Sequence, residues 1–251
     1  MISETSRAQS AIEGAGRSAN PVRYQARVRR WALVGVAAQA LFVVSGLVAA
    51  AWQGPRYSVL ADSVSDMYAR TAPGGMFLVV MFTLCGAATI WFAVASVRPA
   101  LHAGGWRATA GSVLLAVSVV GLGDLLSPFE RLACRMADPG CTSARQISNL
   151  GGRLDDILTT SGVVMLVVAG FFLAAAMKRA PGWRAWARPA RGTIVAIIVL
   201  FVAAVVSQNI GLGGLSERVL EDTVAAAIAA LGIGIIRRCR PTDPQIRSAA
   251  R

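Results

Sequence analysis

The sequence contains a single histidine, His102, and this scarcity restricts the chemistry open to the chain. A zinc site built from several His ligands is excluded, and a zinc site made of carboxylates alone is unusual. The sequence also lacks the HExxH motif, the Walker glycine loop, the dinucleotide fingerprint, the haem-attachment CxxCH motif and the GxSxG elbow. We therefore assign no catalytic residue and no metal site, and we expect no cofactor.

Charged residues are sparse as well, at 15% of the chain, and long apolar runs lie between them. With 55% hydrophobic residues and a mean hydropathy of +0.56, the 251-residue chain is too apolar for an ordinary soluble domain. Because about 20 apolar residues in a helix cross a bilayer, the runs predict an all-α polytopic membrane protein. We expect a bundle of six unbroken transmembrane helices at about 31–52, 75–97, 106–127, 157–177, 192–212 and 215–236.

The basic residues are distributed unevenly over the connecting segments. If the N-terminus is cytoplasmic, the cytoplasmic segments hold 18 of the 25 Lys and Arg residues and only three acidic ones. This asymmetry follows the positive-inside rule, so we expect both termini to be cytoplasmic in a bacterial plasma membrane. Residues 1–22 and 239–251 then form cytoplasmic tails, the first of them disordered, and 23–238 form the membrane domain. No aromatic-basic module accompanies the arginines, so nucleic acid is not expected as a partner.

Two of the four cysteines lie close together in a long loop. Cys134 and Cys141 fall in the segment 127–152, which the charge distribution places outside the cell, where a disulfide is stable. Cys85 lies within an expected helix and Cys239 follows the last one. We predict a Cys134–Cys141 disulfide, with two free thiols as the alternative.

Carboxylates gather at the outer ends of the expected helices. In the loop 53–73, the spacing of Asp62 and Asp66 with apolar neighbours predicts a short amphipathic helix lying on the outer surface. Asp155, Asp156 and Glu217 fall in the expected first turns of their helices, where a negative charge is favourable; this structural interpretation competes with a ligand-binding one.

The last expected helix contains two pairs of charged residues that are four positions apart. Arg218 and Asp222 have the spacing of an ion pair. Glu217 and Glu221 share one face, and Glu221 lies one turn deeper in the membrane, where an unpaired charge is costly.

Asp124 differs from the other carboxylates because its helix ends at the outer side, where the helix dipole disfavours an acidic residue. An arginine such as Arg218 or Arg153, a bound cation or protonation would have to offset this cost. We place Asp124, Arg218 and Glu221 in a hypothetical outer pocket. Asp66 and Asp156 complete the candidate ligand-binding residues.

Four segments together resemble one bacterial membrane family. They are SVLADSVSDMYA after the first expected helix, GDLLSPFERLAC, GRLDDILTTSG, and GLSERVLEDTVAAAIAALGIGII in the last helix. These resemble the six-helix family catalogued as domain of unknown function number 998, over nearly all of residues 30–238. The resemblance implies the six-helix architecture and a lipid context, but no reaction. Members often have a histidine near the start of the fourth helix, where this chain has Arg153.

The function expected from the sequence is the binding or movement of a lipid-like or small amphipathic molecule at the outer leaflet. Membrane lipids and such a ligand are the expected partners. Two alternatives remain: a membrane enzyme that uses the outer carboxylates, and a non-catalytic accessory subunit of a membrane complex. The apparent lack of broken helices argues against a coupled transporter.

Overall fold

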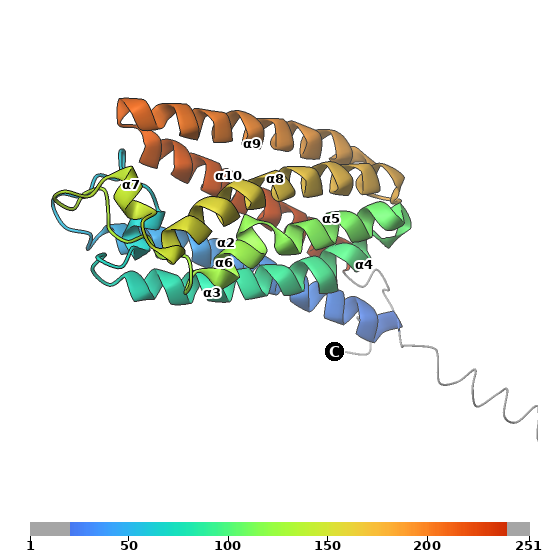
Figure 1. The fold of residues 1–251 in the computed structure, drawn as a ribbon. Helices are drawn as coiled ribbons and strands as arrows, with labels where there is room; N and C mark the ends of the chain where they lie inside the picture. Colours follow the sequence, from blue (N-terminus) through green and yellow to red (C-terminus); the bar gives the residue numbers. More distant parts are fainter. Residues whose placement is uncertain (1–20, 240–251) are drawn as a thin grey trace, which may run out of the picture.

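The computed structural model describes residues 21–239, and the predicted tails lie largely outside this range. Over the described residues the chain is helical without strands, so the predicted all-α class is confirmed. The long helices lie side by side in one elongated bundle (Figure 1). The long elements are α2 (Pro21–Ala50), α3 (Gly75–Phe92), α5 (Trp106–Val117), α8 (Leu150–Arg179), α9 (Ala187–Ser207) and α10 (Gly213–Arg238). The short ones are η1 (Ser65–Tyr68), η2 (Ala93–Val97), α4 (Arg98–Ala100), η3 (His102–Gly104), η4 (Val119–Gly123), α6 (Asp124–Leu126), α7 (Ser143–Gln146), η5 (Arg184–Trp186) and η6 (Gln208–Ile210).

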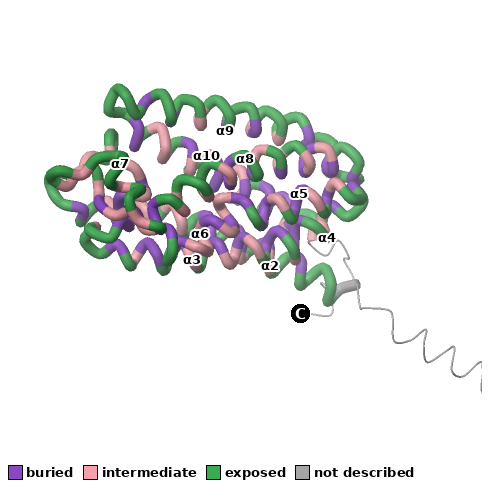
Figure 2. Tube along the Cα trace, viewed as in Figure 1, coloured by how far each residue is buried: buried purple, intermediate pink, exposed green. Residues whose placement is uncertain are grey.

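The surface of the bundle is apolar along its length. Among the described residues five helices are long and apolar enough to cross a membrane, and the bent pair Trp106–Val117 and Val119–Leu126 makes a sixth if it is counted as one span. Figure 2 shows exposed residues along the outward faces of the helices and buried ones toward the bundle axis. Leu47, Val199 and Val206 are each more than 60% exposed. An exposed apolar surface of this extent is stable in hydrocarbon rather than in water, so the chain is a multi-pass membrane protein.

The third crossing is broken, which contradicts the expectation of six unbroken helices. Trp106–Val117 and Val119–Leu126 meet at an angle of 42°. Between them Ser118 adopts an extended backbone (φ −73°, ψ 178°), and its buried hydroxyl donates a hydrogen bond to the Leu115 carbonyl at 2.8 Å. The chain then continues as the π-helix η4. A serine beside a π-helical turn is a recognised cause of a sharp kink.

Small residues let neighbouring helices approach this broken segment closely. Gly86 on α3 lies against it so tightly that a Cβ atom there would stand 2.6 Å from the Gly121 carbonyl oxygen and 2.9 Å from the Asp124 carbonyl carbon. On the other side, a Cβ at Gly162 of α8 would be 2.6 Å from the Val119 nitrogen. These distances are too short for any side chain, so the two glycines set the position of η4 and α6.

Two long loops cover one end of the bundle, which we call the loop end; it lies at the left of Figure 1. Loop 1 (residues 51–74) and loop 3 (residues 127–149) are hydrogen-bonded to each other. The Arg131 guanidinium donates to the carbonyls of Tyr68 and Ala69, both at 2.9 Å, and Arg135 donates to the Gln53 carbonyl at 2.9 Å. The two loops therefore form one cap.

The Cys134 and Cys141 sulfurs lie at disulfide distance within loop 3, as the sequence predicts. The bridge links residues only seven positions apart, so it tightens loop 3 locally and does not tie it to another element.

The close approach at Gly86 gives a stability prediction. Gly86→Ala should lower the stability of the protein by about 1–3 kcal/mol, because backbone atoms of η4 and α6 must move to admit the methyl group. Gly192→Ala is the matched control, since nothing lies within 4 Å of a Cβ at that position. Thermal unfolding of both variants in the same detergent checks this, and equal melting temperatures would contradict the packing described here.

Candidate functional site

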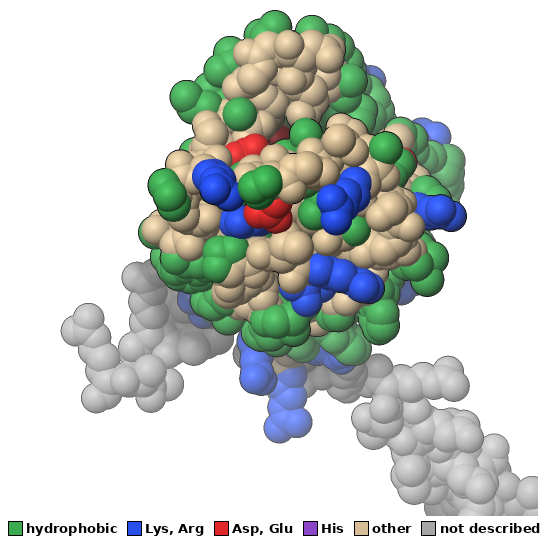
Figure 3. All heavy atoms as spheres, turned by 60° about the vertical axis from the view of Figure 1, so that its left-hand side comes forward, with side chains coloured by type: hydrophobic (Ala, Val, Ile, Leu, Met, Phe, Trp, Pro, Cys, Tyr) green, Lys and Arg blue, Asp and Glu red, His purple; other side chains and the backbone are tan. Residues whose placement is uncertain are grey.

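A cavity of about 660 Å³ lies beneath the cap of loops, in the half of the bundle nearer the loop end. Its walls come from α2, α8, α9 and α10, from the broken segment η4–α6, and from loops 1 and 3. Six carboxylates line it: Asp66, Asp124, Asp155, Asp156, Glu217 and Glu221. Figure 3 brings the loop end forward and shows acidic side chains in a recess, with Lys and Arg around them.

Helix starts determine how deep these carboxylates lie. α8 begins at Leu150, where the Asn149 side chain accepts a hydrogen bond from the Gly152 amide at 2.6 Å, and α10 begins at Gly213. Neither helix has an acidic residue in its first turn. The interpretation of Asp155, Asp156 and Glu217 as first-turn charges is therefore wrong. They lie a turn further in, on the cavity wall.

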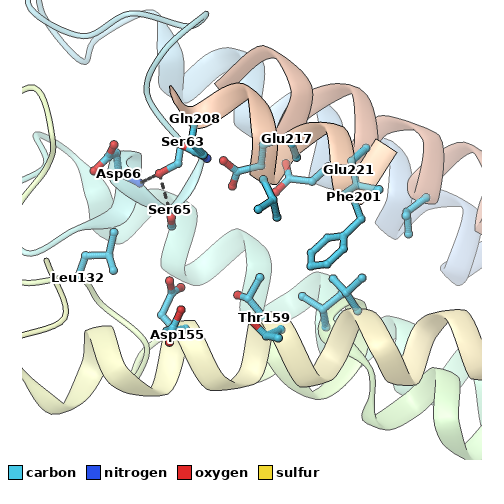
Figure 4. Close-up of a pocket in the computed structure, with 18 of the residues that line it drawn as sticks. Ser63, Ser65, Asp66, Leu132, Asp155, Thr159, Phe201, Gln208, Glu217 and Glu221 are labelled. Atoms are coloured by element: carbon cyan, nitrogen blue, oxygen red, sulfur yellow. Dashed lines mark hydrogen bonds between the residues drawn. The ribbon is translucent and has the colours of Figure 1, made fainter. Parts of the chain in front are cut away.

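The carboxylates of two helices face each other across the cavity. In Figure 4, Asp155 and Thr159 project from α8 toward Glu217 and Glu221 on α10. Residues three or four apart share one face of a helix. The cavity face of α8 continues from Thr159 to deeper apolar residues, and that of α10 likewise continues inward from Glu221. The deeper residues are Val163, Leu166, Val224 and Ala225.

The segment formed by α9 and the short helix η6 after it repeats this change in polarity, although it runs in the opposite direction. Gln208 of η6 lies nearest the loop end, and the cavity face of α9 then continues through the apolar residues Ala204, Phe201 and Ile197. Between Asp155 and Leu166 the wall of α8 extends about 16 Å along the helix axis, at roughly 1.5 Å per residue. Three helices thus surround one space that is polar at the loop end and apolar further in.

No basic side chain neutralises this cavity. Among the residues of 21–239 that line it, none is Lys, Arg or His. The ion pair found in the described part of the chain joins Arg135 and Asp138 in loop 3, at 2.6 Å. None of the six cavity carboxylates has an ion-pair partner among the described residues.

Arg218 binds the loop instead of a carboxylate. Its guanidinium donates to the carbonyls of Val59 and Asp62, both at 2.9 Å, and of Gly214 at 2.8 Å, and it also donates to the Tyr57 hydroxyl. The expected ion pair between Arg218 and Asp222 is absent among the described residues. The Nη1 atom of Arg218 binds two carbonyls of loop 1 and the Gly214 carbonyl of its own helix, so these donors are not available to Asp222.

A smaller cavity of about 360 Å³ lies beside Arg218, between α2, α3, loop 1 and α10. Arg218 and Asp222 line this smaller space and not the larger one. Glu221 and Phe42 contribute to the walls of both. The two cavities are therefore neighbours that share a carboxylate.

Asp66 is the most buried of the six carboxylates, with 1% of its surface exposed. Its Oδ1 atom accepts hydrogen bonds from the Met136 amide at 3.0 Å and the Gln146 side chain at 2.8 Å, whereas Oδ2 has no partner among the described residues. Burial raises the pKa of Asp66 to about 6, and the hydrogen bond from Met136 opposes this rise. The segment around Asp66 is the buried four-residue helix η1, so the predicted surface helix is wrong.

Tyr68 and Glu130 extend the polar network behind the cavity wall. The Tyr68 hydroxyl donates to Asp155 Oδ1 at 3.0 Å, and burial raises the pKa of Tyr68 above its usual range. Glu130 is 5% exposed with an unpartnered Oε1 among the described residues; burial, with the nearby Asp155 and Asp124, raises its pKa to about 8. Nothing in the sequence around Glu130 distinguishes it from a surface residue of a loop.

The structure thus brings Asp66, Asp124, Asp156 and Glu221 to one cavity and leaves Arg218 outside it. Asp155 and Glu217, for which the sequence leaves a helix-dipole and a ligand-binding interpretation open, also line the cavity. The sequence pattern does not predict the hydroxyls of Ser63 and Ser65 as lining groups.

The cavity is not arranged as a metal site. Among the described residues no group of three or more His, Cys, Asp or Glu side chains lies close enough together to hold a metal ion. The carboxylates are spread over four elements around the space. Such a wall can accept hydrogen bonds from several directions and attract positive charge.

Comparison with known proteins places the chain in a family without assigning an activity. A family model described as "Protein of unknown function (DUF998)" matches residues 36–234. This match confirms the resemblance carried by the loop and helix motifs. No curated protein and no solved structure matches the chain.

The raised pKa of Asp66 predicts a dependence of stability on pH. Because the folded protein holds this proton more tightly than the unfolded chain, burial of the carboxyl becomes unfavourable as the pH rises through about 6. Asp66→Asn removes this cost. Its stability relative to wild type should therefore increase between pH 4 and pH 8, by up to roughly 3 kcal/mol at about 1.4 kcal/mol per pKa unit.

Asp138→Asn is the control of opposite sign. Burial acts to raise the pKa of Asp138, but hydrogen bonds from Arg135 and Thr71 outweigh it and lower the pKa. The stability that the Asp138 carboxylate contributes is present above its ordinary pKa and is lost in acid. The Asp138→Asn variant should therefore be less stable than wild type near neutral pH, and the difference should shrink in acid. Thermal unfolding at several pH values distinguishes the two variants. If the stability of both variants relative to wild type changed in the same direction with pH, the opposite pKa shifts of Asp66 and Asp138 would be refuted.

Proposed function

We propose that this chain, which belongs to the DUF998 family of proteins of unknown function, binds or moves a lipid-like or small amphipathic molecule at the outer leaflet. One observation carries the proposal: α8, α10 and the segment formed by α9 and η6 each change from polar to apolar along the wall of a single cavity. A molecule with a polar head and an apolar body matches both parts of this wall. Its head would lie near Asp155 and Glu217, and its body near Phe201 and Leu166.

The size of the cavity supports this ligand class. A volume of about 660 Å³ falls within the roughly 300–1,000 Å³ of typical small-molecule sites. The apolar end lies between membrane-crossing helices, so a ligand arriving from the lipid would keep its body in an apolar environment throughout.

The proposal places the loop end on the outer side of the membrane. The connecting segments at the opposite end carry Lys178, Arg179, Arg184, Arg188, Arg191, Arg237 and Arg238, as the positive-inside rule requires of the cytoplasmic side. Cys134 and Cys141 at the loop end are paired, which suits an oxidising compartment.

The break at Ser118 supports movement of the ligand as well as binding. Val119 and Val120, directly after the break, belong to the cavity wall, and Asp124 follows one turn later. Discontinuous helices beside a binding site are a feature of secondary transporters. A change in the angle at Ser118 would alter the cavity wall.

Native mass spectrometry in lipid nanodiscs tests the proposed function. Wild type should retain a specific amphiphile, and Thr159→Phe should lose it at least tenfold, because Thr159 points into the cavity and the larger ring would fill it (Figure 4). Val199→Phe is the matched control, since Val199 is 61% exposed on the outward face of α9. Retention of nothing but bulk lipid by all three proteins would refute the proposal.

Thiol labelling tests the orientation. In Cys134→Ala, the freed Cys141 should react with a membrane-impermeant maleimide added to intact cells. Cys239, which is free and lies at the opposite end of the bundle, should react after the membrane is opened and not before. Labelling of Cys239 in intact cells would place the loop end in the cytoplasm and overturn the outer-leaflet assignment.

A further inference from the structure

The sign of the charge around the cavity narrows the ligand class further. Six carboxylates line the space, and no Lys, Arg or His among the described residues joins them. Like charges held close together in a region of low dielectric repel one another strongly. A bound group of positive charge removes that repulsion, whereas a phosphate or carboxylate head group adds to it.

Asp66 supplies an independent indication of an absent partner. It lines the cavity, is 1% exposed, and has an Oδ2 atom without a hydrogen-bond partner among the described residues. Buried polar atoms are nearly always hydrogen-bonded in native proteins. Its other oxygen is already held by Met136 and Gln146, so the carboxyl group is fixed in place with one acceptor unused.

The remaining polar groups of the wall include the hydroxyls of Ser63, Ser65, Thr159 and Thr160. Each of them can accept a hydrogen bond as well as donate one. A metal ion does not suit this wall, because no three described carboxylates gather at metal-binding distance. An ammonium group, with three N–H donors pointing in different directions, suits acceptors that are spread over several elements.

From the sign and spread of these groups we infer that the ligand is a cationic amphiphile, with a protonated amine at the loop end of the cavity and an apolar body between α8, α9 and α10. The inference rests on the proposed function, whose ligand it specifies. The amine is held by Asp155 on α8 and by Glu217 and Glu221 on α10. Asp66 and Asp156 line the same cavity and add to the negative charge that attracts the cation.

A series of amphiphiles with the same tail tests this. Dodecylamine, dodecanol and dodecyl phosphate are titrated against the full chain in phosphatidylcholine nanodiscs at neutral pH, and retained ligand is counted by native mass spectrometry. Wild type should retain dodecylamine at least tenfold more tightly than dodecanol, with dodecyl phosphate the weakest.

Two charge variants assign that preference to the cavity. The double variant Glu217→Gln, Glu221→Gln keeps the shape of both side chains and should reduce dodecylamine binding at least tenfold. Asp222→Asn is the matched control, because it removes a carboxylate from the same helix that does not line the larger cavity. Asp156→Asn, at an exposed position of the wall, should give a smaller loss and serves if the double variant fails to fold.

The possible results separate the two claims. Equal or tighter retention of dodecanol or dodecyl phosphate, abolished by Thr159→Phe, would overturn the cationic ligand and leave the proposed function standing. Dodecylamine binding that neither the double variant nor Asp156→Asn weakens would also overturn it. If Thr159→Phe binds all three amphiphiles as wild type does, the proposed function itself fails.

Discussion

The geometry of the loop end depends on one side chain, Arg218, and on what it binds. Its guanidinium donates to carbonyls of Val59 and Asp62 in loop 1 and of Gly214 in its own helix. Backbone bonds from Gly214 to Ala61 and from Leu215 to Leu60 reinforce the attachment. An arginine between two glutamates of the same helix would ordinarily neutralise them. Here its donors bind loop 1 and Gly214, so the cap is fixed and Arg218 forms no ion pair with a carboxylate of the cavity among the described residues.

Sequence reasoning identified the membrane class and the cysteine pair because both depend on composition and spacing. The sequence predicts five ligand-binding residues, and the structure brings Asp66, Asp124, Asp156 and Glu221 to one cavity wall but leaves Arg218 outside it. Their role in binding stays a prediction. Sequence reasoning failed on the depth of Asp155 and Glu217, because the caps at Asn149 and Leu212 lie upstream of the apolar runs that define each span. A shift of one turn changes a surface charge into a cavity charge.

The break at Ser118 and the role of Arg218 could not be read from the sequence for a different reason. Ser118 lies in an uninterrupted apolar run without proline, and the kink is held by what packs against it, namely Gly86 from α3 and Gly162 from α8. Likewise, the spacing of Arg218 and Asp222 fits an ion pair, and only the approach of loop 1 diverts the guanidinium. Contacts between segments far apart in the chain decided both outcomes.

Glu221 forms part of the wall of two cavities, the larger acidic one and the smaller one that contains Arg218. If the Glu221 carboxylate is directed at a molecule in one cavity, it is less available to the other cavity. A molecule bound in one cavity would therefore change the affinity of the other cavity for its ligand. Thermodynamic linkage makes this coupling equal in both directions. The two compartments are thus connected through one side chain, and a molecule bound beside Arg218 would change the affinity of the cavity between α8 and α10 for its own ligand.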